Sequence, residues 1–492
     1  MNTVIVTLKS EKETEARKGR LTLGCERAEF YRDNRKSQDQ SDNEKKKRMR
    51  DTATKKCGCP FMLKGVPLGG DRWKLEVVCG EHNHVIPNTL VGHSFAGRLK
   101  EDEKKIVKDL SLCGVKPKQI LATLKQRDPD NLATMKTIYN VKAYLRLRDL
   151  EGRSIVQQLM KMLDEKHYVH YCRSDPNTDE IMDIFWAHPD SILLARCFPS
   201  VVMVDCTYKT NRYQLPLLQI VGTTSTSKTF CIALALLYKE RENNYEWAYT
   251  HLKNLFDPNA LPSVFVSDRE QASMNAIEKV FPDARLLLCT FHISKKVEQH
   301  CKPTCNTKEE WTNFIQGWHD VMQAECEKDF FDRWEAFKQN CPLKFAKCLN
   351  YLATTWLIHK EKFVLAWTNE VKHRGNRTTN RAEGAHAKLK RWIGSSQGTF
   401  TTLWEALDNL IKVEIDEVKA DFEQSMMKVR HFHKFSQFKE LRSHVSHFAL
   451  TKIVEEMARI QYVRVDIHAC GHAARTVYGI LCAHEIMHYE RE

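Results

Sequence analysis

The chain has 492 residues and is expected to form about three structural units, because single domains usually hold roughly 100–200 residues. Hydrophobic residues make up 42% of it, with 10 Trp, 22 Phe and 14 Tyr, which excludes an intrinsically disordered chain. The apolar run at residues 231–238 is far below the roughly 18 residues that cross a bilayer, so we expect no membrane association.

The cysteines and the first residues indicate the compartment. The chain contains 17 Cys, and its start lacks the charged segment, long apolar run and small-residue cleavage site of a signal peptide. Cysteines without an export signal are expected to stay reduced. Clustered Cys and His are therefore interpreted as metal ligands and not as disulfides.

Positive charge is concentrated in the first third of the chain. Residues 1–150 contain 32 Lys and Arg against 20 Asp and Glu, so they carry +12 of the formal net charge of +13. A basic segment joined to a nearly neutral body predicts a module that docks on a polyanion, and nucleic acid is the expected partner.

The basic third is predicted to contain three parts. Residues 1–20 are polar and charged and are expected to be a flexible tail, and residues 21–90 combine short apolar runs with Cys and His. Residues 101–150 carry apolar side chains at spacings of three, four and seven, which predicts two or three short helices. Segments 117–124 and 136–148 could form a helix-turn-helix-like unit or a plain helical linker.

A different pattern begins near residue 200. It predicts a β-β-β-α-β-α-β order, which is typical of a mixed sheet flanked by helices. The chain is then predicted to be helical and Trp-rich over residues 308–372, and helical again over 380–457. The expected strands cover residues 201–204, 215–223, 230–237, 263–267 and 284–291, and the expected helices cover 243–256 and 271–280.

Three carboxylates stand out in this part of the chain. Asp205 and Asp268 each end an apolar strand, and Glu383 begins a helix after a basic loop. Any one Asp at a strand end is usually a turn or cap residue. The combination is more specific, because the three residues lie in the motifs Val-Asp-Cys-Thr-Tyr-Lys-Thr-Asn, Ser-Asp-Arg-Glu-Gln-Ala and Asn-Arg-Ala-Glu-Gly-Ala-His.

With these motifs and Cys289-Thr-Phe-His292, residues 195–395 resemble the core of Mutator-like element (MULE) transposases, which are related to plant transcription factors of the far-red-impaired-response type. The resemblance implies a ribonuclease-H-like α/β catalytic core with a helical insertion at about residues 295–380. In that family the first strand, the fourth strand and a late helix bear the catalytic acids. The implied catalytic residues are Asp205, Asp268 and Glu383.

The chemistry explains a requirement for three carboxylates. Cutting a phosphodiester and joining a 3′-hydroxyl to another strand are displacements at phosphorus that two Mg²⁺ or Mn²⁺ ions can support. Such ions prefer carboxylate oxygens and keep several waters. The resemblance implies that Asp205 holds both ions, whereas Asp268 and Glu383 hold one each.

Cys289 and His292 have two interpretations. They could be half of a zinc site, or Cys289 is a buried core residue and His292 makes a hydrogen bond that supports the active site. We favour the second, because no second ligand pair of fixed spacing follows nearby. Lys209 and Arg269, beside the acidic motifs, could contact DNA phosphates or lie on a solvated surface.

The N-terminal part contains a candidate Zn²⁺ site with two Cys and two His. Four such ligands satisfy tetrahedral zinc, which supplies folding energy to a small domain. Gly-Cys59-Pro-Phe, Trp73 and Glu-His82-Asn-His84 resemble the DNA-binding domain of the far-red-impaired-response family, of the WRKY and glial-cells-missing type. Cys57 competes with Cys59, and Cys79 is a further alternative. The expected ligands are Cys25, Cys59, His82 and His84.

A run of basic residues lies between Cys25 and Cys57. Such a run is usually a solvated loop, and it could also contact phosphates or act as a nuclear import signal. We expect it to bind DNA. Its members are Lys45, Lys46, Lys47, Arg48 and Arg50.

Residues 465–486 resemble a SWIM zinc finger, normally Cys-x-Cys followed by Cys-x-His. Histidine stands in the first Cys position, and His472 is an alternative ligand. A metal-free remnant is the other interpretation. The expected ligands are His468, Cys470, Cys482 and His484.

The sequence thus predicts a multidomain α+β protein: a small β-rich zinc-binding N-terminal domain, helices over 101–150, an α/β core over 195–395, helices over 396–457 and a C-terminal SWIM-like finger. The expected function is a nuclear DNA transposase that binds terminal inverted repeats and target DNA, as a homo-oligomer in the DNA complex. A domesticated transposase that regulates transcription is the alternative, and a ribonuclease-H-like nuclease is a third hypothesis.

Overall fold

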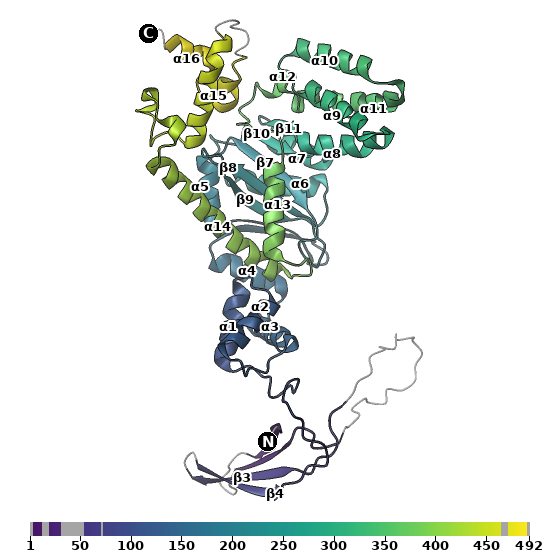
Figure 1. The fold of residues 1–492 in the computed structure, drawn as a ribbon, viewed down its shortest axis with the longest axis vertical. Helices are drawn as coiled ribbons and strands as arrows, with labels where there is room; N and C mark the ends of the chain where they lie inside the picture. Colours follow the sequence, from purple (N-terminus) through teal and green to yellow (C-terminus); the bar gives the residue numbers. More distant parts are fainter. Residues whose placement is uncertain (1–2, 12–18, 31–53, 70–71, 464–470, 490–492) are drawn as a thin grey trace. The chain divides into compact units, whose positions relative to one another are not determined.

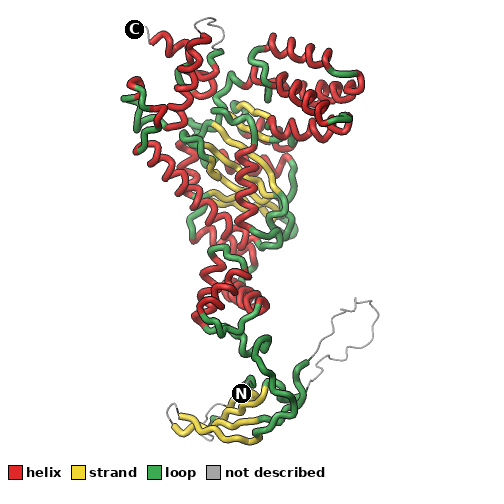
Figure 2. The backbone as a smooth tube through the Cα atoms, in the orientation of Figure 1, coloured by secondary structure: helices red, strands yellow, loops and turns green. Residues whose placement is uncertain are grey.

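A computed structural model describes residues 3–11, 19–30, 54–69, 72–463 and 471–489 (Figure 1). The chain divides into two compact units, residues 1–152 and 153–492. Each unit has its own β-sheet, drawn in yellow in Figure 2. Within the described ranges, no helix combines the length and apolar character that a membrane crossing requires.

The first unit begins with a four-stranded antiparallel sheet in the order β1-β2-β3-β4. The prediction of a flexible tail over residues 1–20 is wrong for Ile5–Glu11, because this segment pairs with β2 from Ile5 opposite Cys25 to Glu11 opposite Arg20. Pairing satisfies backbone groups whatever the polarity of the outward side chains. The strands are β1 (Ile5–Glu11), β2 (Arg20–Cys25), β3 (Met62–Gly69) and β4 (Arg72–Cys79).

Three helices complete the first unit, as the apolar spacing predicts. Their shared core contains Val107, Ile120, Leu124 and Ile138. Pro117 takes the first position of the second helix, where a missing N–H costs nothing. The helices are α1 (Glu101–Leu112), α2 (Pro117–Arg127) and α3 (Met135–Leu150).

The second unit is built on a seven-stranded mixed sheet in the order β11-β10-β7-β8-β9-β6-β5. Strands β7, β10 and β11 are parallel, and the remaining neighbours pair antiparallel. The predicted mixed sheet is confirmed, but its expected start at residue 195 is wrong, because β5 and β6 precede it. The strands are β5 (Val169–Ser174), β6 (Ile181–Ala187), β7 (Val201–Thr207), β8 (Leu217–Thr223), β9 (Thr229–Leu236), β10 (Val264–Ser267) and β11 (Arg285–Leu288).

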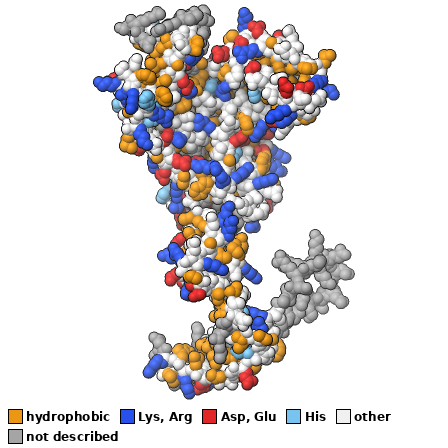
Figure 3. Space-filling view, viewed as in Figure 1, with side chains coloured by type: hydrophobic (Ala, Val, Ile, Leu, Met, Phe, Trp, Pro, Cys, Tyr) orange, Lys and Arg blue, Asp and Glu red, His pale blue; other side chains and the backbone are white. Residues whose placement is uncertain are grey.

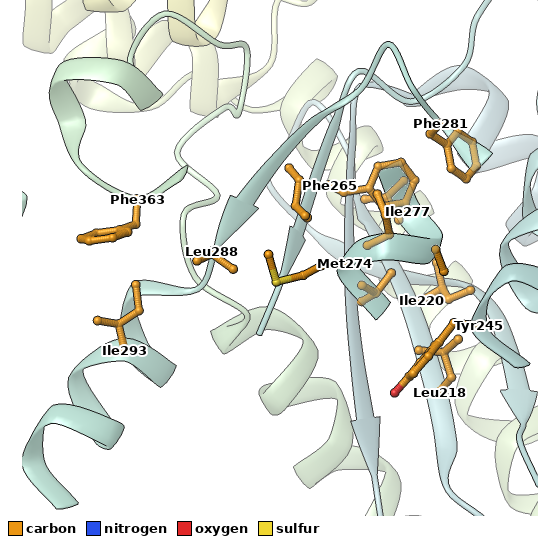
Figure 4. Close-up of a cluster of buried hydrophobic side chains, with 14 of the residues drawn as sticks. Leu218, Ile220, Tyr245, Phe265, Met274, Ile277, Phe281, Leu288, Ile293 and Phe363 are labelled. Carbon is orange, nitrogen blue, oxygen red and sulfur yellow. The ribbon is translucent and has the colours of Figure 1, made fainter. Parts of the chain in front are cut away.

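Helices cover both faces of this sheet. The cluster in Figure 4 joins Leu218 and Ile220 of β8 to Tyr245 of α6 and to Met274 and Ile277 of α7. Helices α13 and α14 cover the opposite face. The helices that surround the sheet are α4 (Ile155–Glu165), α5 (Pro189–Cys197), α6 (Glu242–Lys253), α7 (Gln271–Val280), α13 (Asn380–Ile393) and α14 (Phe400–Met427).

Helices also form the segment between β11 and α13 and the C-terminal part. The strand predicted to reach residue 291 ends at Leu288, because Cys289 caps the next helix and accepts the backbone N–H of His292 at 3.4 Å. The prediction of helices over 380–457 fails at residues 428–446, where turns alternate with the short 3-10 helices His431–His433 and Ser436–Phe438. The helices are α8 (Thr290–Cys301), α9 (Lys308–Met322), α10 (Glu327–Asn340), α11 (Ala346–Tyr351), α12 (Leu365–Thr368), α15 (His447–Val463) and α16 (Ala483–Tyr489).

Helix α14 places a buried carboxyl group against β9. Glu414 accepts the backbone N–H of Cys231 at 3.3 Å, and burial raises its pKa to about 7 although Lys388 lies 3.8 Å away. The folded protein therefore binds a proton that the unfolded chain releases above about pH 4.5. By linkage, stability falls as pH rises from about 4.5 to 7.

Glu414→Gln should relieve this penalty. We expect the variant to raise the free energy of unfolding at pH 8 by about 1–3 kcal/mol and to change it little at pH 5, since each pKa unit corresponds to about 1.4 kcal/mol. Urea unfolding at the two pH values measures this difference. Exposed Glu423, on the same helix, gives the matched control Glu423→Gln. Equal effects of Glu414→Gln at both pH values would contradict the prediction.

Candidate metal centres and acidic site

Strand alternation directs two of the predicted acids to the face covered by α13. Successive side chains of a strand point to opposite faces. Val201 and Met203 of β7 pack against α13, so Asp205 shares their face. Val264 and Val266 of β10 pack on the same side, which directs Asp268, the next residue in that series, to it as well.

Helix α13 carries the third acid. Small side chains at Ala382 and Ala385 let the helix pack closely on this face of the sheet. Glu383 lies in the first helical turn, and His386 follows three residues later with Nδ1 3.5 Å from Asp205 Oδ2. Burial, followed by the charge of Lys390, lowers the pKa of His386 to about 4.

The electrostatics show a concentration of negative charge. Burial, and then the charges of Asp268 and Glu383, raise the pKa of Asp205 to about 7. Burial, and then the charge of Glu240, raise the pKa of Asp268. A carboxylate beside others in a buried place is costly unless a cation balances it. The structure thus places Asp268 and Glu383 close enough to Asp205 for the charges of both to act on it.

The carboxylate oxygens do not converge on a single point. Among the described residues, the groups of Cys, His, Asp or Glu whose ligand atoms all lie within 4.8 Å of one another do not include this triad. Ions in a two-metal site are about 3.5–4 Å apart, so their ligands spread over a wider space. Hard oxygen ligands fit Mg²⁺ or Mn²⁺.

Glu240 is an acid that the sequence did not single out. It lies between β9 and α6, accepts a hydrogen bond from Tyr245 at 3.1 Å and accepts another from Tyr208. Its charge acts on both Asp205 and Asp268. No local motif marks it, because its proximity to the triad arises only when β9 lies beside β8 and β7.

Cys289 and His292 meet the residue that precedes α13. Sγ of buried Cys289 accepts the backbone N–H of Thr379 at 3.0 Å and the Thr379 hydroxyl at 3.1 Å. Oγ1 of Thr379 lies 3.1 Å from Nδ1 of His292, whose Nε2 is 3.2 Å from Glu383 Oε1. Burial raises the pKa of Cys289 and lowers that of His292. The pair therefore links the start of α8 to the start of α13.

The four predicted N-terminal ligands come together. Cys25 ends β2, Cys59 precedes β3, and His82 and His84 follow β4, with all four ligand atoms within 4.8 Å of one another. Sγ of Cys25 is 3.3 Å from His84 Nε2, and Sγ of Cys59 is 3.3 Å from His82 Nδ1. This group could hold a metal ion such as zinc.

Cys57 lies outside this group. It is exposed, and its Sγ is 3.5 Å from Asn83 Oδ1. We expect Cys59→Ser to lower the Zn²⁺ affinity of the full chain by at least about tenfold, since a ligand is lost, whereas Cys57→Ser leaves it unchanged. Competition with a chromogenic chelator measures both affinities. Equal losses in the two variants would contradict this assignment.

A second Cys/His group lies at the C-terminal end. His472, Cys482 and His484 have ligand atoms within 4.8 Å of one another, and Cys482 Sγ is 2.8 Å from His484 Nδ1. The alternative ligand His472 is thus beside two of the predicted ones. The predicted ligands His468 and Cys470 lie outside the described residues, as do all five of the basic residues from Lys45 to Arg50.

Comparison with known proteins gives two kinds of match. A family model, the MULE transposase domain, matches residues 201–296, which include Asp205, Asp268, Cys289 and His292 and end before Glu383. FAR1-RELATED SEQUENCE 5 of Arabidopsis thaliana is 22% identical over 378 residues, covering 74% of this chain and 46% of that protein. FAR-RED IMPAIRED RESPONSE 1 of the same plant is 21% identical over 347 residues, which cover 68% of this chain and 41% of that protein.

A fungal protein is similar over a longer stretch. PKS-NRPS hybrid synthetase cheA of Chaetomium globosum is 24% identical over 489 residues, which cover 89% of this chain and 10% of that protein. The chain thus spans less than half the length of each of these relatives. The resemblance seen in the sequence is confirmed: the chain is related to the MULE transposases through residues 201–296 and is similar to the FAR1-type proteins.

Proposed function

We propose that the chain is a DNA transposase whose acidic site cleaves DNA and transfers strands with divalent metal ions. The observation that carries this proposal is the approach of Asp268 and Glu383 to Asp205 on one face of the sheet, where the charges of both raise the pKa of Asp205. A structural role would not require two further acids beside a buried carboxyl group. A divalent cation would balance them.

The sheet supports a ribonuclease-H-like core. Strands β9-β8-β7 are antiparallel, and β10 and β11 extend the sheet parallel to β7. Asp205 lies on the first of these five strands, Asp268 directly after the fourth and Glu383 on a later helix. This is the arrangement that the resemblance implies, with helices α8–α12 as the insertion before Glu383.

The residues of the acidic site would have different roles. Asp205, Asp268 and Glu383 would hold the metal ions, with Asp205 between the other two. Bound ions would activate the attacking oxygen and stabilise the leaving oxygen at phosphorus. Lys295, whose Nζ is 3.8 Å from Glu383 Oε2, is half exposed and could contact a phosphate of the bound strand.

The first unit would position the DNA. A zinc ion held by the N-terminal Cys and His would fix the loop before β3 and the segment after β4 to the end of β2. Strand β4 is exposed along most of its length, with Trp73 at 50%, and so is accessible to a duplex. The helices α1–α3 would extend this surface, and action on DNA would place the protein in the nucleus.

Regulation of transcription without catalysis is the second candidate. The similarity to the FAR1-type proteins favours it. A regulator would keep the zinc-dependent DNA binding of the first unit and would use the second unit as a scaffold for protein contacts.

Incubation of the full chain with end-labelled duplexes separates the two candidates. The duplexes should carry the terminal inverted repeats that flank the coding region. The transposase proposal predicts cleavage at the repeat ends with Mg²⁺ or Mn²⁺ and none with EDTA. Binding without cleavage under all metal conditions would support the regulator instead.

The salt dependence of binding tests the role of the first unit. Lys and Arg also appear on the visible surface of the second unit, interspersed with acids (Figure 3), whereas residues 1–150 carry +12 of the net charge. We expect fragment 1–152 to reproduce the slope of the full chain, near −5 for about six phosphate contacts. Fragment 153–492 should show a much shallower slope. A steep slope for the second fragment would assign the phosphate contacts to the core.

A further inference from the structure

Hydrogen bonds around Thr379 determine which nitrogen of His292 carries a proton. The Thr379 hydroxyl has one hydrogen and donates it to Cys289 Sγ at 3.1 Å. Its oxygen can therefore only accept from Nδ1 of His292, 3.1 Å away. His292 then carries a proton on Nδ1, which leaves Nε2 as the nitrogen that can bind a metal ion.

Nε2 of His292 faces a carboxylate oxygen of Glu383. Nε2 lies 3.2 Å from Glu383 Oε1, and this buried oxygen accepts no hydrogen bond from any described residue. At this distance the nitrogen and the carboxylate oxygen need a cation between them, which is either a proton on Nε2 or a metal ion that both atoms bind. Ligand atoms in cis positions around a metal ion at ~2.1 Å are about 3.0 Å apart in an octahedral site and about 3.4 Å apart in a tetrahedral site.

We propose that His292 is a metal ligand, which holds a divalent ion together with Glu383. The inference rests on the proposed function, because it completes the same acidic site. The Nδ1–H···Oγ1 contact is the outer hydrogen bond that metal-binding histidines usually make to fix their tautomer and orientation. Thr379 is then a positioning residue, which Cys289 holds through the two hydrogen bonds it accepts.

An imidazole ligand changes which ion the site prefers. Mg²⁺ binds oxygen ligands almost exclusively, whereas a first-row transition metal accepts nitrogen beside oxygen. The site should therefore favour Mn²⁺ over Mg²⁺ more strongly than three carboxylates alone would. Lys295 lies near the other oxygen of Glu383 and is half exposed, so it can move away when the ion binds.

Electron spin echo envelope modulation of Mn²⁺ detects a directly bound imidazole nitrogen. The sample is the full chain, with zinc supplied first in an amount that fills only the thiolate-containing Cys/His groups and Mn²⁺ added afterwards in excess. We expect ¹⁴N modulation in the wild type, its replacement by a ¹⁵N signal in protein labelled with ¹⁵N-histidine, and its loss in His292→Ala. His319→Ala, a nearby histidine bonded to Ser294 at 3.1 Å, should keep the modulation.

Metal affinity gives a second readout. His292→Ala should weaken Mn²⁺ binding by at least about tenfold and weaken Mg²⁺ binding less. Thr379→Val, which lacks the accepting oxygen, should weaken Mn²⁺ binding in the same direction, and Thr379→Ser should restore it. This pair keeps the test decisive even if His292→Ala fails to fold.

The outcomes separate this inference from the proposed function. Mn²⁺ that binds, is lost in Asp205→Asn and carries no histidine modulation would overturn the role of His292 alone. Modulation that persists in His292→Ala and disappears in His386→Asn would assign the nitrogen to the other histidine and also overturn it. A wild type that binds no Mn²⁺ beyond its Cys/His groups would overturn the proposed function as well.

Discussion

Asp205→Asn, Asp268→Asn and Glu383→Gln are each expected to abolish metal-dependent DNA cleavage while DNA binding is retained. Each substitution keeps the size of the side chain and removes a charged ligand. Bound metal contributes several kcal/mol to the stabilisation of the transition state, so the loss of its ligand should lower the cleavage rate by at least about 100-fold. Cleavage of repeat-end duplexes and their binding at low salt measure the two properties separately.

Misfolding can be excluded in the same experiment. Because Asp205 is a buried acid with its pKa raised to about 7, neutral Asn should make the protein no less stable at pH 8. Glu335→Gln, an exposed acid on α10, is a charge-matched control and should cleave like the wild type. Cleavage near the wild-type rate by any triad variant would remove that residue from the site.

Removal of zinc should abolish DNA binding and unfold the N-terminal sheet. The ligands connect the end of β2, the loop before β3 and the segment after β4, which otherwise share few buried side chains. A structural zinc ion contributes about 10–16 kcal/mol, as much as the whole stability of an ordinary domain. Elemental analysis and duplex binding before and after chelation measure the effect.

The second unit is the internal control for this experiment. Its seven-stranded sheet has a core of its own, separate from the C-terminal Cys/His group, so chelation should leave the thermal unfolding transition of this sheet in place. Restoring Zn²⁺ should restore DNA binding. Full binding by a metal-free protein would contradict a zinc-dependent first unit.

Two acids of the candidate site could be predicted from the sequence, because each lies in the same short segment as the strand that it ends or follows. Apolar runs predict β7 and β10, and alternation places Asp205 in the series of Val201 and Met203. The pairing of β10 with β7 then brings the series of Val264 and Val266, which continues to Asp268, to the same face. The apolar pattern likewise predicts the succession of strands and helices along the chain from β7 to β11. Cys59 and the two His occur in short motifs, whereas their distance to Cys25 depends on the register of β2 with β3.

Other features depend on contacts between distant segments. Thr379 is an unremarkable Thr in a basic loop until the chain brings it to Cys289, 90 residues earlier. Glu240 joins the acids only through the pairing of β9 with β8. Strand β1 ends in the exposed polar residues Lys9, Ser10 and Glu11, so pairing with β2, and not apolar composition, determines its structure there.

Anomalous diffraction from crystals of the zinc-loaded chain soaked in Mn²⁺ would locate metal ions at the acidic site. We expect manganese peaks within bonding distance of carboxylate oxygens of Asp205, Asp268 and Glu383, and the loss of these peaks in Asp205→Asn crystals. Manganese confined to other places, with the three carboxylates bare at saturating Mn²⁺, would contradict a metal-dependent catalytic site in this protein.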